Sequence, residues 1–182
     1  MGVAHVSEIQ DVRLVQADLN LDSRGHFIKM HPQDLLTEKI NSVAVSVNPK
    51  RGTIRGLHFQ IEPYAEEKIV SCIQGATCEV IVDIRPSSKS FGKFATFQLS
   101  EENPEQLYLP KGVAHGFQTL LPNTVVQYIL TSQYSQGSSF SIDSFSLAAF
   151  DWPINDFIIS EKDQNGISIQ EAAQKYAASM TL

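Results

Sequence analysis

The middle of the chain is a series of short segments rich in β-branched residues, separated by turn signals such as Asn-Pro, Gln-Gly and Pro-Lys-Gly. These segments either alternate between apolar and polar residues or are apolar throughout. Short strands at a spacing of roughly 8–12 residues are typical of an all-β sandwich or barrel. The expected strands are Val43–Asn48, Thr53–Gln60, Ile69–Gln74, Cys78–Ile84, Phe94–Leu99, Gln106–Leu109, His115–Leu120 and Thr124–Leu130.

Helical patterns occur only towards the ends of the chain. The range His31–Lys39 is compatible with a short helix. Ser168–Met180 predicts a terminal helix, because Ser168 is a good N-cap residue and Glu171 follows three positions later. We expect Asp163–Gly166 to form the loop before this helix. The apolar face of the helix would consist of Ile169, Ala172, Ala173 and Tyr176.

Length and charge limit the classes of function. The 182 residues suit a single domain over 1–182, with a core of about 10–163 and a helical extension of about 167–182. The formal net charge is −6, which argues against a general affinity for nucleic acid or anionic membranes. A small anionic ligand would need a local cluster of basic side chains. No apolar run reaches the roughly 18 residues of a membrane span, and the N-terminal residues lack a secretion signal.

The two cysteines, Cys72 and Cys78, lie within predicted strands. This placement favours two buried thiols over a disulfide. Free thiols fit the reducing cytoplasm, which is the location we expect.

Two of the five histidines stand out from the rest. His58 lies in the segment Arg-Gly-Leu-His-Phe-Gln, and His115 lies in Pro-Lys-Gly-Val-Ala-His-Gly-Phe. Taken singly, each could equally be a hydrogen-bonded core histidine. Surface or local packing roles are expected for the other three, His5, His26 and His31.

The pair of histidines resembles the two sequence motifs of the cupin barrel, whose metal-binding members supply His-x-His, a Glu and a further His. Here His58 and His115 are present, but Gln60 and Lys68 occupy the other two ligand positions. A protonated ammonium cannot ligate a divalent cation. We therefore expect no metal and no organic cofactor. A histidine beside a lysine suits proton abstraction next to a carbonyl with stabilisation of the enolate, as in epimerisation.

Longer stretches resemble the dTDP-4-dehydrorhamnose 3,5-epimerase family of cupin-like epimerases. The resemblance runs from about Asp22 to Asp163. It implies an all-β, cupin-type double-stranded β-helix (a jelly-roll barrel) with short peripheral helices and a C-terminal helix. The stretches that carry it are Asp22–Gly25, Gly52–Gln60, Lys68, Val82–Arg85 with Ser88–Gly92, Leu109–Phe117, Tyr128 with Tyr134, Trp152-Pro153 and Ser160–Asp163.

The resemblance also implies roles for individual residues. His58 would be the catalytic base, and Asp163 its carboxylate partner. Lys68 would stabilise the enolate oxygen, and Tyr128 would be the acid on the opposite face. The residues implied to bind substrate are Arg24, Phe27, Arg55, Gln60, His115 and Tyr134, with Tyr134 bearing on which carbons are epimerised. Arginines suit a diphosphate.

Some positions depart from the family pattern. Ser42, Ala44, Ser46 and Asn48 replace the usual Gln-x-Asn-x-Ser-x-Ser, and Lys29 and His26 replace an acidic residue and a Phe. The segment Ser141–Phe150 stands where the family has Trp-Asn-Asp-Pro, and the helix from Ser168 extends past the usual end. The substrate could therefore be another nucleotide sugar (CDP- or GDP-linked), or only one carbon could be epimerised.

Several alternatives stay open at this point. A ketoisomerase, a non-catalytic nucleotide-sugar-binding cupin and a metal-dependent cupin enzyme are each compatible with the barrel. The expected partners are a small-molecule nucleotide sugar and a second copy of the chain. The resemblance implies a homodimer that exchanges N-terminal strands, with Arg24 and its neighbours reaching the other subunit's pocket.

Overall fold

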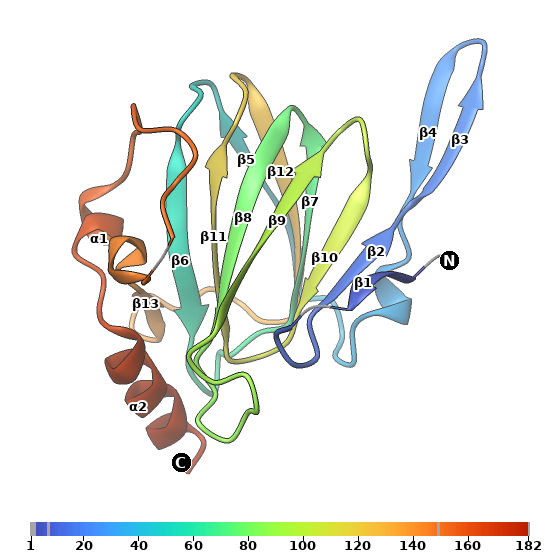
Figure 1. Cartoon of the computed structure of the whole chain (residues 1–182). Helices are drawn as coiled ribbons and strands as arrows, with labels where there is room; N and C mark the ends of the chain where they lie inside the picture. The colour runs from blue at the N-terminus through green and yellow to red at the C-terminus, as the bar shows by residue number, and fades with distance from the viewer. Residues whose placement is uncertain (1–2, 7, 149, 182) are drawn as a thin grey trace.

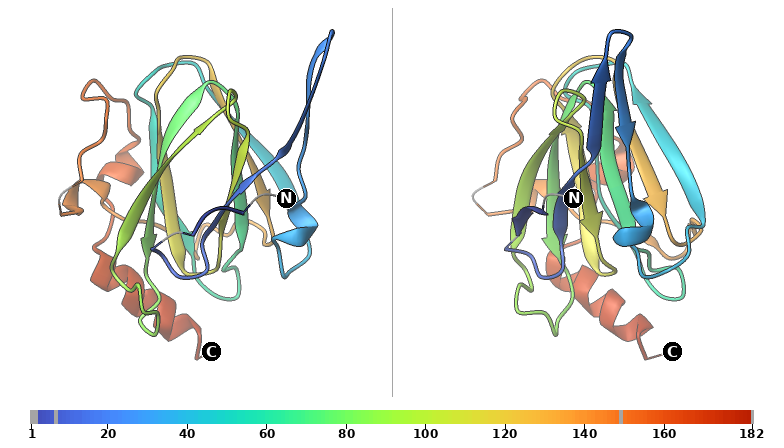
Figure 2. Two further views of the ribbon diagram at one scale, coloured as in Figure 1. Left: turned by 45° about the vertical axis from the view of Figure 1, so that its right-hand side comes forward. Right: turned by 90° about the vertical axis from the view of Figure 1, so that its right-hand side faces the viewer.

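The computed structural model describes residues 3–6, 8–148 and 150–181. Two antiparallel sheets face each other and form a barrel, and a two-stranded hairpin projects beyond it (Figure 1 and Figure 2). The six-stranded sheet has the order β1-β2-β10-β7-β12-β5, and the five-stranded sheet has the order β13-β6-β11-β8-β9. The prediction of an all-β jelly-roll barrel with a C-terminal helix is confirmed.

The eight predicted strands are all present, with ends shifted by at most two residues. In chain order they are β5 (Ser42–Asn48), β6 (Ile54–Gln60), β7 (Lys68–Gln74), β8 (Ala76–Asp83), β9 (Phe94–Ser100), β10 (Glu105–Leu109), β11 (Val113–Thr119) and β12 (Thr124–Leu130).

Five further strands are ones that the sequence analysis does not predict. β3 and β4 form the projecting hairpin, and their side chains are mostly exposed, so no apolar face marks them in the sequence. The five are β1 (Val3–Val6), β2 (Arg13–Gln16), β3 (Asp18–Asp22), β4 (Gly25–Lys29) and β13 (Ser139–Ser141).

Two predictions about the helical segments are wrong. The range His31–Lys39 contains only a 3-10 turn, η1 (Pro32–Asp34), and a second turn, η2, covers Ser144–Ser146. The range Asp163–Gly166 is not simply a loop, because α1 (Glu161–Gln164) includes Asp163. The Ser160 hydroxyl accepts a hydrogen bond from the Asp163 amide and so caps α1.

The space between the two sheets is filled by apolar side chains from both. Val70, Cys72 and Val126 of the six-stranded sheet pack against Ile81 and Phe117 of the five-stranded sheet. Both cysteines are free, and Cys72 is buried as predicted, whereas Cys78 is only partly buried.

The outer face of the five-stranded sheet is covered by the C-terminal part of the chain (Figure 1). Ala172 and Tyr176 of α2 (Ile169–Ser179) pack onto Val80 and Val82 of β8 in one buried cluster. Ser168 caps α2, as predicted, by accepting the Glu171 amide hydrogen over 3.1 Å. No helix in the described part of the chain is long and apolar enough to cross a membrane.

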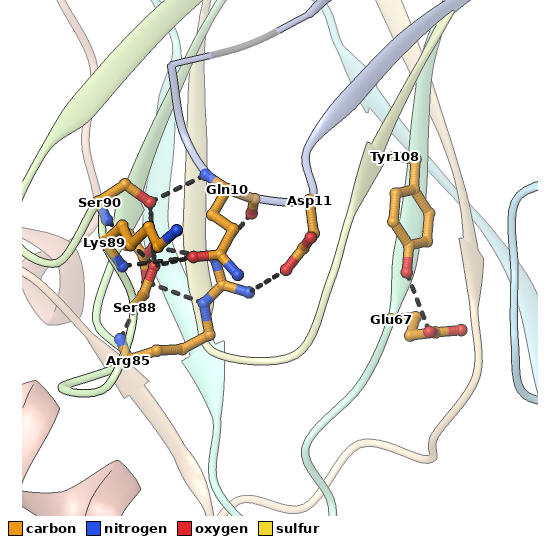
Figure 3. Close-up of polar contacts among 9 residues, drawn as sticks. Gln10, Asp11, Glu67, Arg85, Ser88, Lys89, Ser90 and Tyr108 are labelled. Carbon is orange, nitrogen blue, oxygen red and sulfur yellow. Dashed lines mark hydrogen bonds and ion pairs between the residues drawn. The ribbon is translucent and has the colours of Figure 1, made fainter.

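Polar contacts of Arg85 and Tyr108 connect loops to the barrel (Figure 3). Arg85 donates to the Asp11 carboxylate over 3.2 Å and to the Gln10 carbonyl over 2.7 Å, which joins the β1–β2 loop to the end of β8. Tyr108 on β10 donates to Glu67 over 2.9 Å. Glu67 directly precedes Lys68, so this contact anchors the start of β7.

The cap of α2 gives a test of the fold. Replacing Ser168 by Ala should lower the free energy of unfolding by about 1 kcal/mol, because the Glu171 amide loses its acceptor. Ser168→Asp, which keeps an acceptor oxygen, is the matched control and should preserve stability. Urea denaturation of the three proteins measures this, and an unchanged midpoint for Ser168→Ala would show that the cap does not stabilise the barrel.

Candidate active site

A pocket of about 620 Å³ lies between the two sheets. His58 on β6 lines one wall, and Lys68 and Tyr128 of the six-stranded sheet line the other. Seven of the ten site residues expected from the sequence line this pocket, namely Arg55, His58, Gln60, Lys68, Tyr128, Tyr134 and Asp163. Glu66 and Lys162 are further ionisable lining residues.

A β-bulge in β6 directs two of these side chains into the same pocket. Arg55 and His58 are three residues apart, so in a regular strand they would point to opposite faces. They pair with Phe117 and His115, which are only two residues apart, so β6 has an extra residue between them. Gly56 lies in the bulge with φ +105°, and a Cβ there would lie 2.6 Å from the His115 carbonyl oxygen. Only glycine fits this conformation.

His58 and Asp163 form a hydrogen-bonded pair. Nε2 of His58 lies 2.7 Å from Oδ1 of Asp163. The His58 side chain is 40% exposed to the pocket, whereas that of Asp163 is only 5% exposed. Asp163 also accepts hydrogen bonds from the Ser141 hydroxyl over 2.8 Å and from the Gly56 amide over 3.2 Å.

These donors fix the charge state of Asp163. Burial acts to raise its pKa, but the hydrogen bonds from His58, Ser141 and Gly56 and the charge of His58 outweigh burial, so the pKa lies well below its usual value. The carboxylate therefore accepts at neutral pH and His58 must donate from Nε2. In neutral His58 the lone pair is then on Nδ1.

Lys68 and Tyr128 lie on the other wall of the pocket. Nζ of Lys68 lies 3.1 Å from Glu66 Oε1, and both side chains are about nine-tenths buried. Burial raises the pKa of Tyr128, against a smaller opposing effect of the Ser46 side chain, so its hydroxyl stays protonated at neutral pH.

His115 lies behind the pocket rather than on its surface. It is 4% exposed and does not line the cavity, so the expectation of direct substrate contact is not met. Its Nε2 lies 2.6 Å from Glu79, which also accepts from the Thr77 hydroxyl. Burial lowers the pKa of His115 against the opposing effect of Glu79. Its ring packs edge-on against Tyr128, with centroids 6.5 Å apart.

Two positions that depart from the family pattern lie beside residues of the pocket. Oδ1 of buried Asn48 accepts from Arg55 Nε over 2.8 Å, which orients the guanidinium in the pocket. Ala44 lies opposite Tyr128 in the β5–β12 pairing and offers no side-chain hydrogen bond. The segment thus orients Arg55 through Asn48, and beside Tyr128 it offers the Ser46 side chain instead of a polar group at position 44.

Arg24 and Phe27 lie on the β3–β4 hairpin and do not line the pocket of their own chain. The Arg24 side chain is 87% exposed and pairs with Asp22 over 2.5 Å. Phe27 is 66% exposed. Within the described residues, no group of three or more His, Cys, Asp or Glu side chains is arranged to hold a metal ion.

Comparison with known proteins decides the family. The family model for dTDP-4-dehydrorhamnose 3,5-epimerase matches residues 6–171. The chain belongs to this family. It is similar to dTDP-4-dehydrorhamnose 3,5-epimerase of Escherichia coli, with 38% identity over 173 residues that cover 91% of this chain and 93% of the relative.

Solved structures of family members share the fold. The Bacillus anthracis epimerase, crystallised with TDP and PPi bound, is 36% identical with a TM-score of 0.85, and the match covers 92% of this chain and 98% of that one. The Legionella pneumophila dTDP-6-deoxy-D-glucose-3,5-epimerase, in complex with dTDP-4-keto-L-rhamnose, is 31% identical with a TM-score of 0.83 and 90% of each chain covered. The cupin-type fold expected from the sequence is therefore confirmed.

Four polar residues of the site are not predicted by the sequence analysis. Glu79 does carry a signal, since it is a charged residue inside the apolar run Cys78–Ile84. Glu66 and Lys162 carry one as well, since Glu66 lies two residues before Lys68 and Lys162 directly precedes Asp163. Only Ser141 carries no local pattern, because the tertiary fold brings it to Asp163 from 22 positions away.

The pH dependence of stability tests the state of Asp163. Because its folded pKa lies below the unfolded value of 3.8, the ionised carboxylate stabilises the fold above that value, and this stabilisation is lost as the pH falls. The difference in unfolding free energy between wild type and Asp163→Asn should therefore shrink between about pH 5 and pH 2. Urea titrations across that range measure the difference.

Asp151→Asn, at an exposed position away from the pocket, is the control for simple loss of a carboxylate. A wild-type advantage over Asp163→Asn that stays constant or grows on acidification would contradict the charge state assigned to Asp163.

Proposed function

We propose that this protein is an epimerase that acts on a nucleoside-diphosphate 4-keto-6-deoxyhexose by removing and returning a proton at C5, C3 or both. The observation that carries the proposal is the pair His58–Asp163 on one wall of the pocket, with Lys68 and Tyr128 on the other. A base and an acid on opposite walls can address opposite faces of one carbon. This is the requirement for inversion.

His58 acts as the base. Its Nε2–H is held by Asp163, so Nδ1 takes the proton from the carbon next to the C4 carbonyl. The C–H electron pair moves into the enolate, and the imidazolium is stabilised by the ionised Asp163. The attraction between the imidazolium of His58 and the carboxylate of Asp163 thus lowers the activation barrier to proton abstraction.

Lys68 and Tyr128 complete the reaction. The Lys68 ammonium stabilises the negative charge on the C4 oxygen of the enolate. Tyr128 then donates its hydroxyl proton to the other face of the carbon and the C4 carbonyl re-forms. Solvent reprotonates the tyrosinate and takes up the proton of the His58 imidazolium, which restores both groups. Neither step needs an oxidant or a reductant, since the proton removed and the proton returned balance.

The charge of the pocket suits a diphosphate. Arg55 and Lys162 line it together with Lys68, in a chain whose net charge is −6. These three side chains form the local basic cluster that an anionic ligand would need. Arg24 of the same chain does not line the pocket and so does not add to this cluster. The free thiols fit the cytoplasmic location that is part of the proposal.

A homodimer with exchanged N-terminal strands is the second part of the proposal. The edge strand β5 exposes Val43, Val45 and Val47, which are 58%, 53% and 62% exposed, and the projecting hairpin exposes Leu21 and Phe27. Such an apolar edge is a site for pairing with another chain. A hairpin lying along β5 of a second copy would cover both surfaces and bring Arg24 towards the partner's pocket.

Exchange of carbon-bound hydrogen tests the activity. The protein is incubated in D2O with dTDP-, CDP-, GDP- and UDP-linked 4-keto-6-deoxyhexoses, and proton NMR follows the sugar. Loss of the C3 or C5 proton signal, with product of inverted configuration, is the expected result. Binding without exchange on every sugar would instead identify a non-catalytic nucleotide-sugar-binding protein, and movement of the carbonyl would identify a ketoisomerase.

Substitutions of the base and the acid should have distinct effects. His58→Ala should reduce hydrogen exchange by roughly 100- to 10,000-fold, the usual contribution of general base catalysis. Tyr128→Phe should keep exchange but slow inversion, because the proton returns from the His58 side. The ratio of exchange to inversion, measured by NMR, separates the two.

Tyr176→Phe removes a hydroxyl from a buried tyrosine on α2, outside the pocket, and should leave that ratio unchanged. Equal losses of exchange and inversion in Tyr128→Phe would show that Tyr128 is not the acid.

Complementation tests the shared site. Arg24→Ala and His58→Ala should each be nearly inactive, but dimers mixed from both contain one pocket with Arg24 and His58 intact. Mixing them under conditions that allow subunit exchange should restore up to about a quarter of wild-type activity, as random pairing gives one restored site in half of the dimers. Sedimentation confirms the dimer, and no recovery from exchanged dimers would mean that each chain builds its pocket alone.

A further inference from the structure

The side-chain amide of Gln60 is occupied by protein groups. Its Nε2 donates to the carbonyls of Tyr64 over 3.0 Å and Gln133 over 3.2 Å, and its Oε1 accepts from the Ser135 amide over 2.8 Å. Gln60 is 6% exposed. The amide therefore uses both of its N–H groups on the protein, and little is left for direct binding of a substrate.

Two of these contacts flank Tyr134. Gln60 holds the carbonyl of the residue before Tyr134 and the amide of the residue after it. This part of the chain is irregular, between β12 and β13, so no strand pairing fixes its backbone. The side-chain amide of Gln60 thus provides the backbone hydrogen bonds that a neighbouring strand would provide for a regular strand.

The Tyr134 side chain is held by little else. It lines the pocket but is 69% exposed, and its hydroxyl has no hydrogen-bond partner within the part of the chain that the structure describes. Its place at the pocket therefore follows from its backbone. Gln60 lies two residues after His58 on β6, so the strand that carries the base also sets the position of this ring.

We propose that Gln60 is a positioning residue that fixes Tyr134 against the substrate, instead of binding the substrate itself. The proposal rests on the proposed function for its kinetic readout and corrects the role that the family resemblance implies for Gln60. It makes the Gln60–Tyr134 unit a determinant of substrate affinity that is separate from the proton-transfer groups. A preorganised contact avoids the cost of ordering a loop when the ligand binds.

The matched pair of variants is Gln60→Met and Gln118→Met. Gln118 on β11 is fully buried and holds Ile154 through the same two kinds of bond, both over 2.9 Å, outside the pocket. Both variants lose buried hydrogen bonds, and in both the methionine side chain has a volume similar to that of the glutamine it replaces. Gln60→Met should raise KM about tenfold with kcat within about threefold, since a 1 Å displacement of a substrate-positioning group can cost up to about a hundredfold.

Gln118→Met should leave KM unchanged. If Gln60 had only a structural role, Gln60→Met would reduce the amount of active protein and hence kcat, with KM unaltered, and that result would overturn the proposal.

A double-mutant cycle identifies the route of the effect. In the Tyr134→Ala background, Gln60→Met should change KM by less than about twofold, because the ring that Gln60 positions is already gone. If the two KM effects multiply, Gln60 contacts the substrate directly and the proposal is wrong.

Hydrogen exchange of the unliganded protein gives a readout that needs no substrate. Mass spectrometry of peptides covering residues 131–138 should show faster amide exchange in Gln60→Met than in wild type or in Gln118→Met. If the wild type acts on no sugar in the panel, the proposed function fails but this measurement still decides whether Gln60 holds the loop. Unchanged exchange at 131–138 would overturn the positioning role itself.

Discussion

The hydrogen bond of 2.7 Å between His58 and Asp163 joins residues that are 105 positions apart in the sequence. The same carboxylate accepts from Gly56 in the bulge of β6 and from Ser141 on β13. One buried charge therefore ties the strand that carries His58, its neighbour β13 and the capped turn of α1 into one unit. The orientation of His58 exists only when this end of the barrel is folded, so the geometry of the candidate site and the fold depend on the same contact.

The barrel interior has two parts along its strands: an apolar core and the pocket. Val70, Cys72 and Val126 fill one part with apolar side chains, and Lys68 and Tyr128, on the same strands, face the pocket. Alternation with a period of two puts these residues on one face of the sheet. Buried Lys68 in the pocket is paired with Glu66, since an unpaired buried charge would lower the stability of the fold.

The sequence predicts the parts of this structure that depend on local periodicity and on motifs. The strands β5 to β12 and the cap at Ser168 follow from alternation and capping rules. The β3–β4 hairpin, which contains Leu19 and Leu21, cannot be predicted in this way. Its side chains are exposed on both faces, so no alternation of apolar and polar residues marks its strands. Likewise, the link from Gln60 to the Tyr134 loop spans 75 positions and appears only once β6 and the loop after β12 are adjacent.

Ionised Asp163 keeps the proton of neutral His58 on Nε2 and leaves Nδ1 unprotonated, as the proposed role of His58 requires. Nitrogen NMR of protein labelled at the imidazole nitrogens measures this tautomer directly, with the His58 signals assigned by their absence in His58→Gln. At a pH where the ring is neutral, wild type should show a protonated Nε2 and an unprotonated Nδ1, and Asp163→Asn should show a mixture of tautomers. A proton on Nδ1 of His58 in wild type would contradict this assignment.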